Sequence, residues 1–153
     1  MNDTTLLLGL PDVVVDRVEV DPDGTRVVHV TTRDTPQACP SCGVSATSVK
    51  GWVSTGPRDV PFPVPARLVW RKRRWRCQEP KCARSSFTES MPQIPAGKRV
   101  TVRLRAAAGR AVAEGARTVA QAARDFGLSW PVVHAAFLDH ATAVLPADRK
   151  SVV

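Results

Sequence analysis

The distribution of apolar and polar positions first indicates a β-hairpin at the start of the chain. Residues 13–20 (VVVDRVEV) and 26–32 (RVVHVTT) are rich in β-branched side chains, which favour strands. Between them, DPDG at 21–24 supplies turn residues and ends in a conformationally permissive glycine. We therefore expect a β-hairpin within residues 1–34 that packs against the segment that follows.

The next segment, residues 35–95, is dense in proline and turn residues, with strand candidates at 47–54 and 66–77. This composition predicts short antiparallel strands joined by loops. Such a segment buries little apolar surface of its own, and small units of this kind usually need an additional cross-link such as a structural metal.

After residue 97 the apolar positions recur at spacings of three and four, which predicts a helix over about 98–114 that ends near Gly115. Thr118 is a favourable N-cap for a second, short helix, and Gly127 is suited to end it. Ser129 is suited to cap a third helix that carries a proline in its first turn.

The predicted fold class is therefore α+β, in four parts along the chain. These are an N-terminal β-hairpin (1–34), a four-cysteine ribbon of short antiparallel strands (35–95), a C-terminal helical domain (98–143) and a tail (144–153). The N-terminus lacks the basic region of a signal peptide, and no stretch approaches the ~20 apolar residues of a membrane helix. We expect a cytoplasmic protein without a membrane partner.

Four cysteines in two close pairs give the clearest chemical signal. Cys39 and Cys42 lie in CPSCG, and Cys77 and Cys82 lie in CQEPKC. A tight turn that carries two cysteines presents two thiolates to one ion, and zinc prefers four such ligands in a tetrahedron. Because a closed four-cysteine site leaves no position for water, the expected cofactor is a structural zinc ion. An iron site, a disulfide pair and two unrelated thiol pairs are the alternatives.

Charge is distributed unevenly around a formal net value of +8. Residues 50–110 carry fifteen basic and three acidic side chains, whereas residues 1–37 carry three basic and seven acidic ones. A basic middle segment favours a polyanion partner, most often nucleic acid, although a solvated surface rich in lysine and arginine is the alternative.

The strand candidate RLVWRKRRWRC at 67–77 interleaves two tryptophans with cations. We expect Trp70 and Trp75 to pack in a small core rather than to stack on bases. The cations are candidates for phosphate contacts, which supply affinity but no sequence information. The candidates in this strand are Arg71, Lys72, Arg73, Arg74 and Arg76.

The last two predicted helices match a helix-turn-helix, with a small residue, Ala123, at the crossing and Gly127 at the turn. In such motifs the N-terminal part of the second helix enters the major groove of double-stranded DNA. The candidates for base contact there are Ser129, Trp130 and His134. Further candidates for phosphate contact are Arg99, Arg103, Arg117 and Arg124. An ordinary helical hairpin is the alternative.

The order of these features resembles the N-terminal region of bacterial insertion-sequence transposases of the ISL-three family. The matching residues are LLGLPDVVVDRVEVDPDG near the start, the CPSCG turn, RDVPFP at 58–63, RKRRWRC before the second cysteine pair, SSFTES at 85–90 and the helix-turn-helix. The resemblance implies that this region binds transposon ends, and that a DDE catalytic domain of the ribonuclease-H type follows it in the family.

Such a catalytic domain needs on the order of 100 residues, which are not found after the last predicted helix. We therefore expect a non-catalytic, truncated or partial transposase that recognises terminal inverted repeats, and we do not take Asp125, Asp139 or Asp148 as catalytic. The alternatives are part of an active transposase that continues beyond residue 153 and a free-standing transcriptional regulator. The sequence is compatible with a homodimer.

Overall fold

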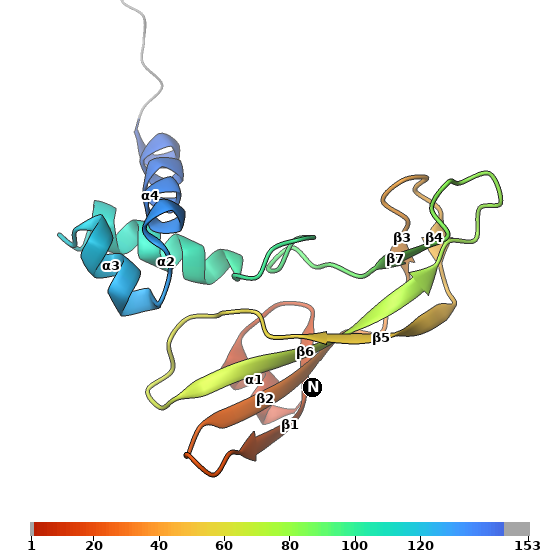
Figure 1. Cartoon of the computed structure of the whole chain (residues 1–153), viewed down its shortest axis with the longest axis horizontal. Coiled ribbons are helices and arrows are strands. Elements are labelled where there is room, and N and C mark those ends of the chain that lie inside the picture. Colours follow the sequence, from red (N-terminus) through yellow and green to blue (C-terminus); the bar gives the residue numbers. More distant parts are fainter. Residues whose placement is uncertain (1, 146–153) are drawn as a thin grey trace, which may run out of the picture. The chain divides into compact units, whose positions relative to one another are not determined.

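A computed structural model describes residues 2–145 of the chain, so the predicted tail from residue 146 onward, with Asp148, lies outside the described residues. The chain divides into two compact units between Thr101 and Val102. The first unit contains strands and one short helix, and the second contains helices (Figure 1). The predicted α+β class is confirmed. Among the described residues, no helix combines the length and the apolar character needed to span a membrane.

The first unit contains eight elements in the described residues. They are α1 (Asp3–Leu8), β1 (Val13–Val20), β2 (Arg26–Thr32), β3 (Gln37–Ala38), β4 (Ser45–Ala46), β5 (Val49–Thr55), β6 (Ala66–Arg76) and β7 (Ser86–Thr88). The second unit contains α2 (Val102–Ala113), α3 (Val119–Phe126) and α4 (Trp130–Val144). Helix α1 has no counterpart in the sequence-based prediction.

Strands β1 and β2 form the predicted hairpin, paired antiparallel from Val13 opposite Thr32 to Val20 opposite Arg26. Gly24 closes the turn at a positive φ of 85°, which a residue without a Cβ adopts freely. The hairpin is not separate from the ribbon, because β2 also pairs with β6 in one sheet of order β1-β2-β6-β5, with β7 on β6.

The pairing of β2 with β6 is parallel, whereas the sequence predicted only antiparallel strands. Between these two strands the chain passes through β3, β4 and β5, and it enters β6 beside the start of β2. There the Arg26 amide donates to the Pro65 carbonyl oxygen at 2.9 Å. A crossover of this length permits parallel pairing, which a short turn cannot make.

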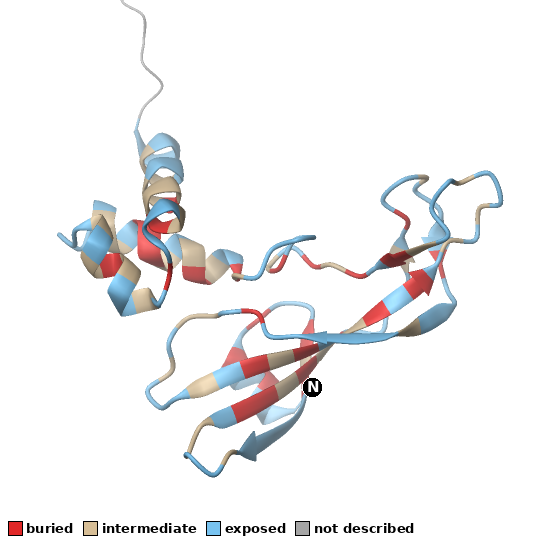
Figure 2. Cartoon of the chain, viewed as in Figure 1, coloured by how far each residue is buried: buried red, intermediate tan, exposed pale blue. Residues whose placement is uncertain are grey.

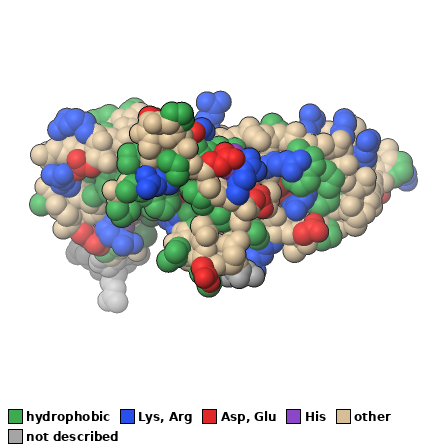
Figure 3. All heavy atoms as spheres, turned by 90° about the horizontal axis from the view of Figure 1, so that it is seen from below, with side chains coloured by type: hydrophobic (Ala, Val, Ile, Leu, Met, Phe, Trp, Pro, Cys, Tyr) green, Lys and Arg blue, Asp and Glu red, His purple; other side chains and the backbone are tan. Residues whose placement is uncertain are grey.

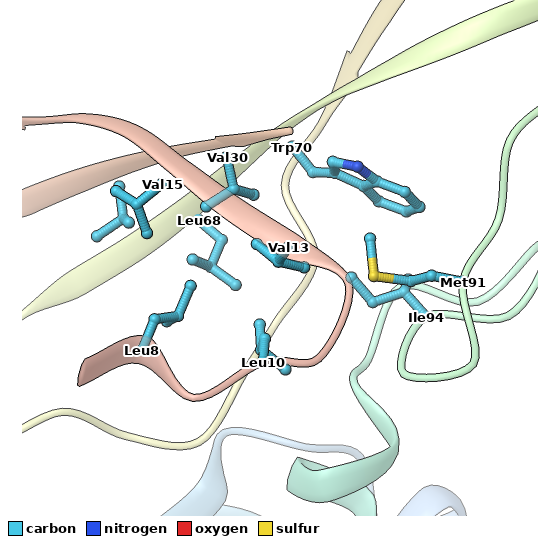
Figure 4. Close-up of a cluster of buried hydrophobic side chains, with 10 residues drawn as sticks. Leu8, Leu10, Val13, Val15, Val30, Leu68, Trp70, Met91 and Ile94 are labelled. Carbon is cyan, nitrogen blue, oxygen red and sulfur yellow. The ribbon is translucent and has the colours of Figure 1, made fainter. Parts of the chain in front are cut away.

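Apolar side chains of α1, the hairpin and β6 form the main core of the first unit, shown in Figure 4. The core residues are Leu8, Leu10, Val13, Val15, Val28, Val30, Leu68, Trp70, Met91 and Ile94. Helix α1 covers this core through polar anchors, because the Val15 amide donates to Thr5 Oγ1 at 2.9 Å and Asn2 Nδ2 donates to the Val15 carbonyl oxygen.

Strand β6 changes its buried face along its length (Figure 2). Leu68 and Trp70 are buried in the first half, whereas Arg73 and Trp75 are buried in the second half. Since successive side chains of a strand point to opposite faces, β6 contributes to one core on each face. Only 1% of Trp70 and 3% of Trp75 is exposed, which confirms that both tryptophans pack in cores.

In the second unit the helix boundaries follow local capping residues. Thr118 forms a capping box with Gln121 at the start of α3, and Gly127 ends this helix at a φ of 64°, as the sequence predicted. Ser129 precedes α4 but its side chain makes no capping hydrogen bond. Helix α2 begins at Val102, later than the predicted residue 98.

Gly109 lies where α2 meets α4 within the second unit. A Cβ added to it would lie 2.6 Å from the Ala136 carbonyl oxygen and 2.7 Å from the Ala136 carbonyl carbon. The missing side chain therefore lets the two helix backbones approach closely. Among its described residues, the buried apolar ones are Leu104, Ala108, Ala122, Leu128, Val133 and Ala136.

Candidate metal centre and nucleic-acid interface

The first cysteine pair lies on the tight turn between β3 and β4. The Gly43 amide donates to the Cys39 carbonyl oxygen at 2.8 Å, and the Cys39 amide donates to the Val44 carbonyl oxygen at 2.9 Å. Gly43 completes the turn at a φ of 76°. The turn therefore brings the Cys39 and Cys42 side chains to one side of the loop, as CPSCG predicted.

The second pair lies where β6 ends. Cys77 follows the last residue of β6, and its amide donates to the Ser85 carbonyl oxygen at 3.0 Å. Cys82 follows in the next turn, and its Sγ accepts the Arg84 amide at 3.4 Å. The chain therefore folds back here to form β7, which pairs with the end of β6.

The four sulfur atoms converge on one point. The Cys39 and Cys82 sulfurs are 4.0 Å apart, the Cys42 and Cys77 sulfurs are 3.6 Å apart, and all four lie within 4.8 Å of one another. A tetrahedral ion with a zinc–sulfur distance of about 2.3 Å separates its ligand sulfurs by about 3.8 Å. The arrangement fits zinc and has no disulfide bond, since all four cysteines are free thiols.

The pKa values of the cysteine thiols in this cluster also favour a bound cation. Burial raises the pKa of Cys39, but backbone hydrogen bonds from Ser41 and Cys42 outweigh burial and lower it to about 7. The backbone hydrogen bond from Glu79 lowers the pKa of Cys77, but burial and the adjacent thiols outweigh it and raise it to about 12. Four thiolates so close together therefore need a metal ion to neutralise their repulsion.

A second core surrounds the cysteines. It consists of Cys39, Ala46, Trp75 and Phe87, with the other three cysteines packed against it. These apolar side chains are few, so the metal ion and its ligands supply much of the cohesion of this part of the first unit.

In the second unit, α3 and α4 meet at a tight turn. The Leu128 amide donates to the Ala123 carbonyl oxygen at 2.9 Å, beside the left-handed Gly127. Ala122, Leu128, Val133 and Ala136 are buried between the helices, whereas Ala123 and Phe126 are only partly buried. This arrangement is a helix-turn-helix with α4 as its second helix.

Two comparisons with family models agree with this geometry. The model of the zinc finger of transposases IS204/IS1001/IS1096/IS1165 matches residues 35–82, and the model of the helix-turn-helix domain of transposase family ISL3 matches residues 89–141. The chain carries the zinc-ribbon and helix-turn-helix region of ISL3 transposases. Its four cysteines hold a structural zinc ion. No curated protein and no solved structure matches the chain.

Both matched regions are of DNA-binding types, and neither is a catalytic domain. Two of the aspartates that the sequence analysis set aside form ion pairs in the structure. Arg117 pairs with Asp125, and Arg105 pairs with Asp139. Both carboxylates are therefore engaged in exposed ion pairs of the helical unit, which contribute little to its stability.

Arg73 is the one predicted phosphate contact that the structure buries. Its side chain is only 10% exposed, and its Nη1 lies 3.3 Å from Glu89 Oε2, a carboxylate that is fully buried. The same nitrogen donates to the Thr32 carbonyl oxygen at 3.2 Å, and the Arg73 amide donates to Glu89 Oε1 at 2.8 Å. Arg73 therefore joins β6 to the end of β2 and to the residue after β7, and its guanidinium is engaged within the protein.

The other cations of β6 remain accessible. Arg71, Arg74 and Arg76 are exposed, and Lys72 is half-buried. On the face drawn in Figure 3, lysine and arginine side chains are spread over the surface among hydrophobic and acidic ones. The Arg71 guanidinium lies 4.2 Å from the ring centroid of Trp52, whose side chain is 44% exposed. Trp52 was not predicted from the sequence, because its position beside Arg71 depends on the pairing of β5 with β6.

The remaining predicted contacts are on or near the helices. Arg99, Arg117, Arg124, Ser129 and Trp130 are exposed, and Arg103 and His134 are half-buried. The rings of Trp130 and His134 stack, with their centroids 4.8 Å apart and their planes at 19°. Since 51% of Trp130 is exposed at the start of α4, this stacked pair occupies the part of the helix that enters DNA in helix-turn-helix proteins.

Proposed function

We propose that this chain recognises the terminal inverted repeats of an insertion sequence, with α4 in the major groove of double-stranded DNA. The observation that carries this proposal is the accessible first turn of α4. Ser129 and Trp130 are exposed there, whereas Val133 of the same helix is fully buried against the rest of the unit. A buried face fixes the helix and leaves the opposite face for base contact.

In this proposal the polar and aromatic residues of α4 supply specificity. Trp130 and His134 support each other by ring stacking, which fixes the direction of both side chains without a bound ligand. The Ser129 side chain makes no capping hydrogen bond to the helix, so its hydroxyl is available to hydrogen-bond a base edge or a phosphate. Side chains held in place before binding lose less conformational entropy on binding.

The exposed cations supply affinity that does not depend on sequence. Arg71, Arg74 and Arg76 on the first unit and Arg124 on the second unit are the phosphate contacts that we propose. The zinc ion has a structural role in this proposal, because its four thiolate ligands leave no open coordination position for a substrate.

The proposal is tested by selecting duplexes from a random-sequence pool with the zinc-loaded chain. We expect the enriched motif to occur in the terminal inverted repeats of the insertion sequence that encodes this chain. Enrichment of a motif that occurs at a promoter and not in these repeats would contradict repeat recognition and favour a regulator. A pool without any enriched motif would contradict sequence recognition altogether.

Variants then test the roles of the residues. We expect Trp130→Ala and His134→Ala to reduce the preference for the selected duplex over random DNA by about 10- to 100-fold, the value of a specific base contact. Arg74→Ala and Arg76→Ala should weaken binding to both duplexes by the same factor. Equal losses on both duplexes for all four variants would refute the division into specific and non-specific contacts.

A further inference from the structure

A basic hollow of about 460 Å³ lies on the first unit, and none of the zinc ligands lines it. Its walls come from the end of β5 and the loop after it, from β6 and from the loop before residue 100. The lining residues are Thr55, Gly56, Pro57, Lys72, Gly97, Lys98 and Arg99. Three of these residues are cations and none is acidic, so the hollow favours an anion.

The position of Lys72 in this hollow is fixed by the main core. Its Nζ lies 4.9 Å from the ring centroid of Trp70, which is almost completely buried. The Trp70 indole nitrogen donates in turn to Thr32 Oγ1 at 3.0 Å. A cation above a buried and hydrogen-bonded aromatic ring is held in place, so Lys72 is a fixed charge at the edge of the core.

The two other cations are placed by backbone contacts between loops. Gly97 has a φ of 74°, and the Lys98 amide donates to the Pro95 carbonyl oxygen at 3.0 Å, which closes a turn. The Arg58 amide donates to the Arg99 carbonyl oxygen at 2.8 Å, and the Thr101 amide donates to the Arg58 carbonyl oxygen at 2.9 Å. The two loops are therefore joined side by side before any ligand binds.

Lys72, Lys98 and Arg99 form no ion pair with a carboxylate in residues 2–145, unlike Arg67, Arg73, Arg105 and Arg117. Three like charges around one open hollow repel one another, and a bound anion removes this repulsion. Lysine acts as a point charge toward phosphate, and arginine can donate two parallel hydrogen bonds to it. The chemistry of the hollow is therefore that of a phosphate site.

We propose that this hollow seats a backbone phosphate of the DNA that the chain binds. This inference rests on the proposed function, and it adds a fixed anchor on the first unit to the specific contacts of α4. DNA is the expected source of the phosphate because the hollow is open to solvent and lies within the segment of fifteen basic and three acidic side chains. The phosphate contact contributes affinity that falls with added salt and carries no sequence preference.

The test compares two triple variants of the full, zinc-loaded chain with equal changes in charge. The first is Lys72→Gln/Lys98→Gln/Arg99→Gln. The matched control, Arg26→Gln/Lys50→Gln/Lys81→Gln, removes three exposed cations that do not line the hollow. Binding to a random-sequence duplex is measured by fluorescence anisotropy over a range of salt concentrations. We expect the first variant alone to lose about 0.9 from the slope of log K against log salt, the value for one phosphate.

Equal changes of affinity and slope in both triple variants would overturn the proposal, because net charge would then explain the effect. Lys72 packs on Trp70, so the loop variant Lys98→Gln/Arg99→Gln provides a second test that leaves the core unchanged. Zinc content and circular dichroism verify the fold of each variant. The same slope for the loop variant and the wild type would also overturn the proposal.

Inorganic pyrophosphate at constant ionic strength distinguishes a free ligand from DNA. We expect it to compete with DNA on the wild type and to compete less on the triple variant Lys72→Gln/Lys98→Gln/Arg99→Gln, the hollow variant. Pyrophosphate binding that the hollow variant abolishes, with DNA binding unchanged, would assign the hollow to a free phosphate compound and overturn the proposal. The preference for the selected duplex over random DNA measures the proposed function separately, because the hollow variant should leave that ratio unchanged.

Discussion

Substitution of Gly109 by alanine tests the close approach of α2 and α4. In an open position of a helix, this change stabilises by about 1 kcal/mol, because alanine has the higher helix propensity. At Gly109 the added Cβ would lie 2.6 Å from a backbone oxygen of Ala136, and no side-chain rotation can relieve that contact. The helices must therefore separate by several tenths of an ångström.

Overpacking of this kind costs about 1–3 kcal/mol in well-packed cores, and a fixed backbone contact favours the upper end of that range. We expect a net loss of about 2 kcal/mol in the free energy of unfolding after the gain in helix propensity. A unit of about 50 residues has a total stability of roughly 3–8 kcal/mol. The loss should lower the Tm of the helical unit by about 10 °C.

Thermal unfolding followed by far-ultraviolet circular dichroism measures this change, since the long helices lie in the second unit. Ala106→Gly, at an exposed position of α2, calibrates the helix propensity and should cost about 1 kcal/mol. If Gly109→Ala raises the Tm, the close approach of the two helices is incorrect.

Two further predictions concern the first unit. Removal of zinc by a chelator, or Cys77→Ser, should expose Trp75 and shift its fluorescence to longer wavelength. The helical circular-dichroism signal of the second unit should persist. Simultaneous loss of both signals would contradict the independent folding of the two units. Arg73→Met should lower the free energy of unfolding by about 3–5 kcal/mol, because it leaves the buried Glu89 carboxylate without its positively charged partner, whereas Arg74→Met should change it little. Similar effects of the two substitutions in urea denaturation would show that Arg73 is not a buried structural residue.

The features that sequence analysis predicted correctly depend on residues close together in the chain. The Thr118 capping box, the left-handed Gly127 and the CPSCG turn each involve a few consecutive residues, so their composition determines their geometry. The two cysteine pairs were also recognisable from spacing alone, although their convergence required the return of the chain from β6 to β7.

The features that were missed or wrong depend on pairing between distant segments. The parallel contact of β2 with β6 and the burial of Arg73 follow from sheet order, which no local pattern encodes. A run of arginines predicts a solvated strand, yet Glu89 and the Thr32 carbonyl oxygen lie where one of them can be buried. From the sequence, Gly109 is likewise only a residue of low helix propensity within α2. Its role in the close approach of the helices follows from the position of α4.

The change of buried face along β6 leads to a prediction about the independence of the ribbon. The matched zinc-finger segment, residues 35–82, contains β6 but lacks β1 and β2, which pack with its first half. In a fragment of residues 35–95, Leu68 and Trp70 would lose most of their core, and full burial of an apolar side chain contributes about 1.5–3 kcal/mol.

We therefore expect this fragment to bind zinc and to protect the amides of residues 72–76 from hydrogen exchange, but to leave those of 66–70 unprotected. A fragment of residues 1–101 should protect both halves of the strand, because it retains the hairpin. Full protection of β6 in the shorter fragment would mean that the zinc core alone orders the strand. Protection of neither half would mean that the hairpin is needed for the zinc core as well, which the separate residues of the two clusters argue against.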